Sequence, residues 1–414
     1  MGFRNTHDHR LRDVVLSVEV RTYSSYGACY LLPKFRGLSL LIWVQNHMFS
    51  EKRNEGRVGH ASSLIVGRTA GRVRGRERLN VYYDEDADLS VLKNDIVAIV
   101  GYGNQGQAQA LNMRDSGVNV IVGNVKDSYY DQAAKDGFKA YSIGEAAKQA
   151  TIICMIIPDE VQKGVYETEI QQHLSKGKML VFSSGYNIHF GFIAPPKDVD
   201  VIDMFPLTFG ARVRERFLNR QSLGSFLAIG QDATGKAKQK ALALAKAIGC
   251  TRGGTFETTF AHETEINLYL EQVVYPAIFR IMALSFDVLV DAGYPPELVS
   301  LEMYLSKEPS EFFASMAELG FFESAKVGST TAQYGEMTRA PRIIKDDIKN
   351  IMKEHLREIQ TGVFANEWAL EQAAGYPVFN KLRKEGLEHP MNEVEKRVKK
   401  LIRPQEAQSK IQSG

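Results

Sequence analysis

The chain has 414 residues, of which 44% are hydrophobic and 24% are charged, and its formal net charge is +2. This length allows two or more domains with cores of their own, and the composition is that of a soluble globular protein. A net charge so near zero gives no support to a nucleic-acid or membrane partner.

Residues 1–79 form a basic leader with 14 Lys and Arg against 6 Asp and Glu, a net charge of +8, so the remainder carries 2 − 8 = −6. Three interpretations stay open: an organellar targeting peptide, a basic tail that contacts nucleic acid or anionic lipid, and a dispensable extension ahead of a start at Met48. Asp8, Asp13 and Glu19 count against a clean targeting peptide. The apolar run at 38–44 is too short to span a membrane.

The three cysteines, Cys29, Cys154 and Cys250, lie far apart in the sequence. They have no zinc-ligand spacing, and an odd number argues against a disulfide framework. A reducing, intracellular setting follows as the default. We therefore expect a cytoplasmic protein, with organellar targeting by the leader left open, and we expect neither a membrane partner nor nucleic acid bound to the core.

The segment "DIVAIVGYGNQGQAQALNMRDSG" opens the first domain, which we place at 80–258. A β-branched strand at 96–100 runs into Gly101, Gly103 and Gly106, and a helical pattern follows as far as Gly117. In this context the glycines are typical of a dinucleotide site, because they allow a tight turn, close approach of a pyrophosphate and close helix packing. The helix N-terminus then presents free N–H groups to the phosphates. We assign Tyr102, Asn104 and Gln105 to the same cofactor site.

The end of the next strand, "VNVIVG", indicates which dinucleotide binds. An NAD site usually has an acidic residue there for the ribose 2′-OH. This chain instead continues from Gly123 into a turn with Lys126 and Ser128, which suit a 2′-phosphate, although Asp127 between them does not. NADP is favoured over NAD.

Further strand patterns lie within 150–162, where a Pro-Asp-Glu loop follows the strand, within 178–190, where the strand runs into a Gly turn, and within 198–206 and 224–235. With an Ala- and Leu-rich helix at 236–250, they predict a doubly wound parallel sheet. Ligands bind at the carboxyl ends of such strands. The loops 158–162, 183–189 and 204–210 should therefore face the cofactor. Within them we assign to the cofactor site Pro158, Asp159, Gln162 and Gly185.

After Thr258 only helical patterns occur, with a break at Gly293–Pro296. We therefore predict an all-helical domain at 259–405 and a short tail at 406–414. Its helices are more apolar than one amphipathic face requires, which suggests burial against each other or against a second copy of the chain.

The first helix of this domain reads "AHETEINLYLEQ" at 261–272. Asn267 and Glu271 are one turn apart and share a face. We expect Glu263 and Glu265 to be solvent-exposed or domain-boundary residues. His189 and His262 have no partner cluster and are expected to be structural.

From about residue 81 to the C-terminus the order of motifs resembles the ketol-acid reductoisomerases. The motifs that carry the resemblance are "VGYGNQGQAQAL", "IPDEVQ", "SGYNIHFG", "DAGYPPELVSLE", "STTAQYGEMTRAPRI" and "FANEW". The resemblance implies a Rossmann-type domain followed by a compact helical domain, and a homo-oligomer with the helical domain at the interface.

The family also implies a two-step reaction. A pair of Mg²⁺ ions promotes an alkyl shift in an acetohydroxy acid such as 2-acetolactate, and NADPH then reduces the product to a 2,3-dihydroxy acid on the route to valine and isoleucine. The resemblance assigns catalytic roles to Glu271 and Glu302, which are also the retained metal ligands, and to Ser329.

The chain departs from the family pattern where the metals bind. Asn267 and Ser306 stand where two of four carboxylates are expected, which removes about two negative charges from a site for two dications. Mg²⁺ prefers carboxylate oxygens, so one Mg²⁺ held by Glu271 and Glu302 is what the sequence leaves.

Two further positions differ from the family. Ser184 replaces a His and Leu207 replaces a Lys near the substrate, which removes proton-carrying and cationic groups. The isomerase half of the reaction is therefore more affected than the reductase half.

Three hypotheses remain: a ketol-acid reductoisomerase with weak or lost activity, an NADP-dependent reductase of another small keto acid or imine that needs no metal, and a non-catalytic cofactor-binding relative.

Overall fold

The computed structural model describes residues 79–402. The expectations for the leader and for the tail at 406–414 lie outside the described residues. Strands end at Thr258, and from Phe260 onward the described chain is helical, so the fold class is confirmed.

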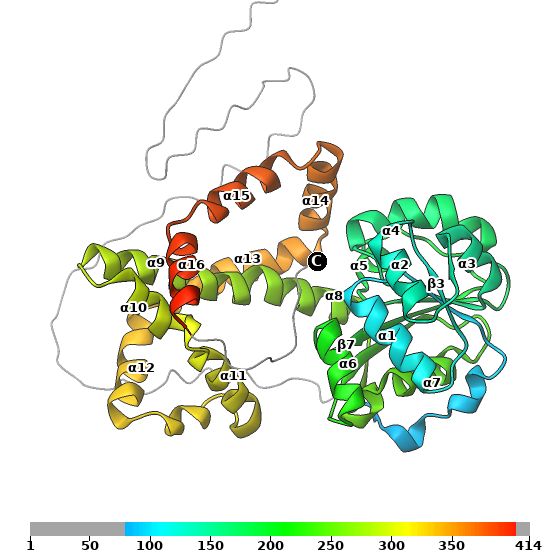
Figure 1. The fold of residues 1–414 in the computed structure, drawn as a ribbon, viewed down its shortest axis with the longest axis horizontal. Coiled ribbons are helices and arrows are strands. Elements are labelled where there is room, and N and C mark those ends of the chain that lie inside the picture. The colour runs from blue at the N-terminus through cyan, green and yellow to red at the C-terminus, as the bar shows by residue number, and fades with distance from the viewer. Residues whose placement is uncertain (1–78, 403–414) are drawn as a thin grey trace, which may run out of the picture. The chain divides into compact units, whose positions relative to one another are not determined.

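The first part of the described chain is built on one nine-stranded sheet with the order β1-β9-β8-β7-β6-β5-β2-β3-β4 (Figure 1). Neighbouring strands run parallel except in the β7–β8 and β1–β9 pairs, which are antiparallel. The sequence pattern did not distinguish these two pairs, because an apolar strand has the same pattern in either direction. The strands are β1 Val81–Tyr82, β2 Val97–Val100, β3 Val120–Gly123, β4 Ala140–Tyr141, β5 Ile152–Met155, β6 Met179–Phe182, β7 Asp200–Pro206, β8 Ser225–Gln231 and β9 Thr255–Thr258.

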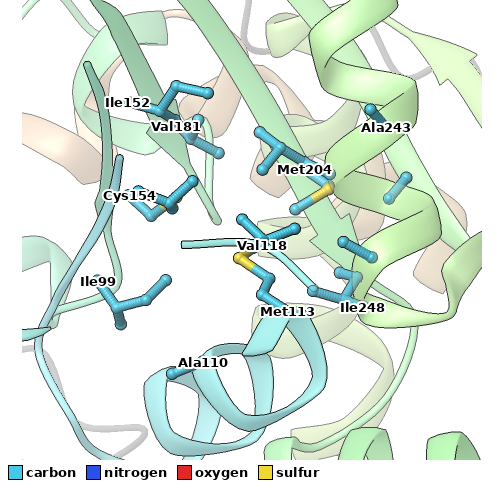
Figure 2. Packing of buried hydrophobic residues seen from close by; sticks show 14 of the residues in the cluster. Ile99, Ala110, Met113, Val118, Ile152, Cys154, Val181, Met204, Ala243 and Ile248 are labelled. Atoms are coloured by element: carbon cyan, nitrogen blue, oxygen red, sulfur yellow. The ribbon is translucent and has the colours of Figure 1, made fainter. Parts of the chain in front are cut away.

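Helices cover both faces of this sheet, as a doubly wound fold requires. Residues of α1 and α7 share a core cluster with one face, whereas residues of α3 and Phe260 of α8 share a cluster with the other. Figure 2 shows the first cluster, in which Met113 of α1, Met204 of β7 and Ile248 of α7 are buried. The helices are α1 Asn104–Asp115, α2 Ser128–Lys135, α3 Ile143–Gln149, α4 Asp159–Val165, α5 Tyr186–His189, α6 Gly210–Leu218 and α7 Ala237–Ile248.

The second part, Phe260 to Leu401, contains no strand in the described residues. Gly293 has a φ of +91° and Pro295 and Pro296 follow it, which explains the predicted break between α9 and α10. The helices are α8 Phe260–Tyr269, α9 Tyr275–Asp291, α10 Pro296–Ser300, α11 Glu308–Leu319, α12 Thr330–Ile343, α13 Ile348–Gln360, α14 Val363–Ala373, α15 Pro377–Leu387 and α16 Met391–Leu401.

Two short π-helical segments interrupt the helices of this domain. Leu270–Val274 joins α8 to α9, and Leu301–Leu305 follows α10. A π-helix bonds each N–H to the carbonyl five residues earlier, so each turn holds more residues than an α-turn. The side-chain directions predicted from α-helical spacing therefore change at these two places.

The helical domain buries few of its apolar side chains. Its buried cluster consists of Phe286, Val299, Val394 and Val398 with a few partly buried neighbours. Within residues 79–402 one continuous helical stretch, Phe260–Asp291, is long and apolar enough to cross a membrane, with a mean hydropathy of 1.8, yet little of it is buried. Much of the apolar surface of this stretch is thus left uncovered by the other residues of 79–402.

Candidate active site

The turn between β2 and α1 has the geometry of a phosphate-binding loop. Gly101 adopts a φ of +94°, and a Cβ on Gly106 would lie 1.9 Å from the carbonyl oxygen of Gly101. A Cβ on Gly103 would meet nothing within 4 Å. Two glycines are therefore required by the fold itself, whereas Gly103 leaves open space at the N-terminus of α1, where a pyrophosphate binds in such folds.

The residues between these glycines have separate structural partners. The ring of Tyr102 is buried and its hydroxyl donates to Asp136 at 2.8 Å, while its backbone N–H donates to Asn124 at 3.0 Å. Asn104 begins α1, and the side chain of Gln105 donates to the carbonyl of Thr208 at 2.9 Å. The side chain and the backbone N–H of Tyr102 are thus both engaged within the fold, and the loop after β7 is held beside the glycine turn.

The turn after β3 leaves Lys126 and Ser128 exposed at the start of α2. Asp127 caps this helix, because its carboxylate accepts hydrogen bonds from the backbone N–H groups of Tyr129 and Tyr130 at 2.9 and 3.0 Å. It also accepts one from Asn124 at 2.8 Å. The carboxylate is therefore committed to the fold, which reduces its effect on a phosphate between Lys126 and Ser128.

At the ends of β5 and β6, a hydrogen-bond network connects the predicted residues. Gln162, which is buried, donates to the carbonyl of Ile157 at 2.9 Å and to Asp159 at 3.2 Å. Asn187 donates to the carbonyl of Asp159 at 2.9 Å and to the side chain of Gln162 at 3.1 Å. Pro158 immediately precedes α4. This network fixes Asp159 at the carboxyl edge of the sheet.

Beside the predicted residue Asp159, which is partly buried, the structure places two buried carboxyls, Asp203 and Glu263, whose burial sequence reasoning missed. Burial raises the pKa of Asp159 to about 7, and the charges of Glu263, Glu160 and Glu271 add to this, whereas a hydrogen bond from Ser184 at 3.2 Å opposes it. Asp203 of β7 is fully buried. A charged residue inside the apolar run "VIDMF" was the signal that could have revealed it.

Glu263 was expected to be solvent-exposed or at the domain boundary. It lies in the first turn of α8, where the helical domain begins and contacts the sheet domain, but it is not solvent-exposed, because only 2% of it is accessible. Its Oε2 accepts hydrogen bonds from the backbone N–H of Gly185 at 2.9 Å and from Thr264 at 3.2 Å. Burial raises its pKa. The first turn of α8 is therefore bound to the turn after β6, and Gly185 has no room for a side chain beside it.

Asn267 and Glu271 follow Glu263 along the same helix. Glu271 lies in the π-helical segment and is exposed; partial burial raises its pKa, and a hydrogen bond with Asn267 opposes the shift. Its negative charge contributes to the raised pKa of Asp159. The structure thus places Glu271 near the carboxyl edge of the sheet.

Glu302 lies in the second π-helical segment, at an apolar cavity of about 360 Å³ lined also by Leu289, Tyr294, Pro295, Leu298, Val299 and Met303. Ser306 accepts a hydrogen bond from the backbone N–H of Glu308 at 3.3 Å, and Lys307 adopts a φ of +72°. The helix therefore ends at this point and restarts, so Ser306 has a structural role here.

The remaining predicted positions lie on the surface or at helix ends. Ser329 is the N-cap of α12 and accepts a hydrogen bond from the backbone N–H of Ala332 at 3.2 Å. Leu207 is 43% exposed at the carboxyl end of β7. His189 lies 3.4 Å from Glu265, which also accepts a hydrogen bond from Gln360 at 3.0 Å.

A two-metal centre does not fit the described residues. Among residues 79–402, no three or more His, Cys, Asp or Glu side chains come together so that they could hold a metal ion. The candidate ligands are two glutamates, an asparagine and a serine, and Mg²⁺ requires several oxygen ligands in near-octahedral geometry.

Comparison with known proteins places both parts of the chain in one family. Residues 91–254 match the family "Acetohydroxy acid isomeroreductase, NADPH-binding domain", and residues 260–403 match "Ketol-acid reductoisomerase, C-terminal domain". The chain is 43% identical to a ketol-acid reductoisomerase (NADP⁺) of Pyrococcus abyssi over 325 residues, which cover 78% of this chain and 97% of that protein. It is 42% identical to the corresponding protein of Methanocaldococcus jannaschii over 326 residues, 78% of this chain and 98% of that one.

Among solved structures, the chain is similar to an NADH-preferring ketol-acid reductoisomerase from an uncultured archean. The TM-score is 0.74 at 37% identity, and the match covers 78% of this chain and 99% of that one.

Proposed function

The chain belongs to the ketol-acid reductoisomerase family, and from this we propose that it converts 2-acetolactate-type acetohydroxy acids into 2,3-dihydroxy acids with NADPH. The observation that carries the proposal is the open face of Gly103 at the start of α1, in a chain whose two domains both match the family. A bound NADPH supplies the hydride for the reduction.

The residues of the chain would hold the cofactor across the carboxyl edge of the sheet. The free N–H groups at the start of α1 would bind the pyrophosphate beside Gly103. Lys126 and Ser128 would bind the 2′-phosphate, and the segment from Pro158 to Gln162 with Gly185 would border the nicotinamide. The turn at Lys126 would distinguish NADPH from NADH, because the two cofactors differ in the ribose 2′-phosphate that this turn would bind.

The reduction also needs a proton at the substrate oxygen that the hydride makes basic. Asp159 meets two requirements for this role: its pKa is raised to about 7, and its Oδ2 accepts a hydrogen bond from Ser184. The hydroxyl of Ser184 would orient the carboxyl where the family has a histidine. Glu271 would face the same space from the helical domain.

We further propose that the chain functions as a homo-oligomer in which the helical domain forms the interface. Large apolar side chains on α9 are exposed, and the buried cluster of the domain is small. Exposed apolar patches of this kind are typical of protein interfaces. Partner residues would then complete the site, and Ser329 would contact the substrate from the neighbouring copy.

We propose a cytoplasmic location. The support is that Cys154 and Cys250 are buried as free thiols, which suits a reducing compartment. Cell fractionation with an antibody to the chain would test this.

The experiment that tests the function follows NADPH oxidation with two substrates. The first is 2-acetolactate, which requires both steps; the second is 3-hydroxy-3-methyl-2-ketobutyrate, which requires only the reduction. Each is tested with Mg²⁺ and with a chelator. Mg²⁺-dependent turnover of both supports the proposal. Turnover of the second alone, without metal, would favour a metal-independent reductase, the function that the incomplete ligand set would suit. No turnover of either would contradict both.

A further inference from the structure

Asp203 is a buried acid without a partner. It lies in β7 in register with Phe182 of β6 and Ala228 of β8, and it is fully buried. Among residues 79–402, neither of its carboxyl oxygens has a hydrogen-bond partner. Alternation along the strand places its side chain on the same face as Val201, which belongs to the core cluster that contains Phe260 of α8. An unpaired charge in such a place is very costly, so the carboxyl is expected to stay neutral.

The ionisable groups that face Asp203 are also acidic. Burial raises its pKa most, and the charges of Glu263 from α8 and Asp159 from α4 raise it further. The nearby backbone N–H of Met204, which does not meet hydrogen-bond geometry with either carboxyl oxygen, lowers it. Tyr186 of α5, whose hydroxyl is buried without a partner, faces Asp159. None of these groups is a cation. Two negative charges on Asp203 and Glu263 would therefore lie in a medium that screens them poorly.

Glu263 and Phe260 hold the first turn of α8 on the same face of the sheet. The Oε2 of Glu263 accepts the hydrogen bond from Gly185 at 2.9 Å. The ring of Phe260 lies so close to Gly230 that a Cβ there would be 2.7 Å from it. Asn267 and Glu271 follow Glu263 at four and eight residues, so a movement of this first turn would also move Glu271.

We propose that Asp203 is a positioning residue. In its neutral form it allows Glu263 to stay buried against the sheet. When it ionises, it displaces the first turn of α8, and Glu271 moves with that turn. The active site would then be closed at neutral pH and would loosen in alkaline solution. Its consequence for activity depends on the proposed function, but its consequence for folding does not.

The sign of the effect on stability follows from linkage. The folded state raises the pKa of Asp203 well above its ordinary value, so between these two pKa values the folded chain holds a proton that the unfolded chain has lost. The contribution of Asp203 to stability is therefore complete below the ordinary carboxyl pKa. It decreases as the pH rises toward the raised pKa of the folded state.

The test compares the wild type with Asp203→Asn, which keeps the shape of the side chain but cannot ionise. Asp200→Asn is the matched control, because Asp200 is also fully buried in β7 but accepts hydrogen bonds from the backbone N–H and hydroxyl of Thr234 at 2.9 and 2.6 Å. Thermal midpoints are measured from pH 5 to pH 10. We expect the midpoint of the wild type to fall with pH several degrees more than that of Asp203→Asn, and the Asp200→Asn midpoint to fall in parallel with the wild type.

Two further measurements separate positioning from a merely structural role. An infrared difference spectrum at pH 7 should show a neutral carboxylic acid in the wild type that is absent in Asp203→Asn. In the reductase assay, ionisation of the proposed proton donor Asp159 already lowers kcat/KM above pH 7, about tenfold per pH unit. Ionisation of Asp203 should make the wild-type loss steeper than this at higher pH, and only this steeper part should be absent in Asp203→Asn. Parallel midpoint curves for the wild type and Asp203→Asn, or no neutral acid band from Asp203, would overturn the proposal. A wild type without activity would instead contradict the proposed function and leave these two readouts intact.

Discussion

At the scale of single residues, the three glycines of the first turn have different physical reasons to be glycine. Gly101 needs a positive φ, and Gly106 needs the absence of a Cβ because the carbonyl of Gly101 occupies that space. Gly103 has an ordinary φ of −74° and open space around it. The fold itself therefore does not require glycine at position 103, and the three positions can be separated by experiment.

Gly103→Ala is expected to fold normally but to bind NADPH at least about tenfold more weakly, because the added methyl group occupies the pyrophosphate space. Gly106→Ala is expected to lose about 1–3 kcal/mol of stability through overpacking. Thermal unfolding and fluorescence titration with NADPH measure the two effects. Unchanged NADPH affinity in Gly103→Ala would contradict the assignment of this turn.

Lys126→Glu is expected to weaken NADPH binding by about 10- to 100-fold, the range for loss of a charged hydrogen bond, while NADH binding changes little. Lys135→Glu, an exposed charge reversal at the other end of α2, is the control. Dissociation constants for both cofactors provide the measurement. Equal losses for NADPH and NADH would exclude contact between Lys126 and the 2′-phosphate.

Sequence reasoning located the glycines and the lysine turn because such motifs are local. It did not locate the roles of Glu263 and Asp203, for two reasons. The alternating pattern of "AHETEINLYLEQ" left the buried side of α8 undefined, and contact between α8 and the turn at Gly185 joins residues 78 positions apart. The burial of a polar residue by a distant segment is a tertiary property, which periodicity does not report.

At the scale of secondary-structure elements, helix ends and π-helical segments decide where the candidate side chains point. The sequence predicted β2, β3, β5, β6, β7 and β8, which contain apolar runs, but not β1 and β4, which contain only 2 residues each and are too short for a pattern. β9 is as long as β2, but its sequence TFET has no apolar run. The π-helical segments were also not predictable, because their side chains follow no α-helical period.

Ser329 is the N-cap of α12, and it is also proposed to contact the substrate. Ser329→Ala is expected to lose about 0.5–2 kcal/mol of stability. Ser329→Asn, which retains a capping oxygen, should recover most of this loss but not kcat/KM. Thermal unfolding and the acetolactate assay measure these outcomes. Full activity of the Asn variant would mean that Ser329 is only a helix cap.

At the scale of the whole molecule, the two domains differ in how many of their apolar side chains they bury. The sheet domain surrounds two large clusters of apolar residues, whereas the helical domain has one small cluster. Phe279 and Val288 of α9 are 68% and 67% exposed. A second copy of the chain that covers α9 would supply the missing burial.

The double variant Phe279→Glu with Val288→Glu is expected to convert the proposed oligomer to a monomer, because four or more charges would be buried at a symmetric interface. Leu218→Glu on α6, which is 60% exposed in the sheet domain, is the control. Light scattering after gel filtration gives the mass of each. An unchanged mass for the double variant would mean that the interface lies elsewhere. A monomeric wild type would mean that there is no such interface. Association of the wild type with lipid vesicles would identify a membrane as the partner of α9.

The π-helical segments that contain Glu271 and Glu302 also bear on ancestry. A π-turn arises most simply when one residue is inserted into an existing α-helix, and that insertion rotates everything beyond it by about 100°. Both candidate carboxylates of the helical domain lie at such insertions. In an alignment of relatives, a one-residue gap within 270–274 or 301–305 would therefore mark lineages in which these carboxylates point in a different direction. This would hold even where all neighbouring residues are identical.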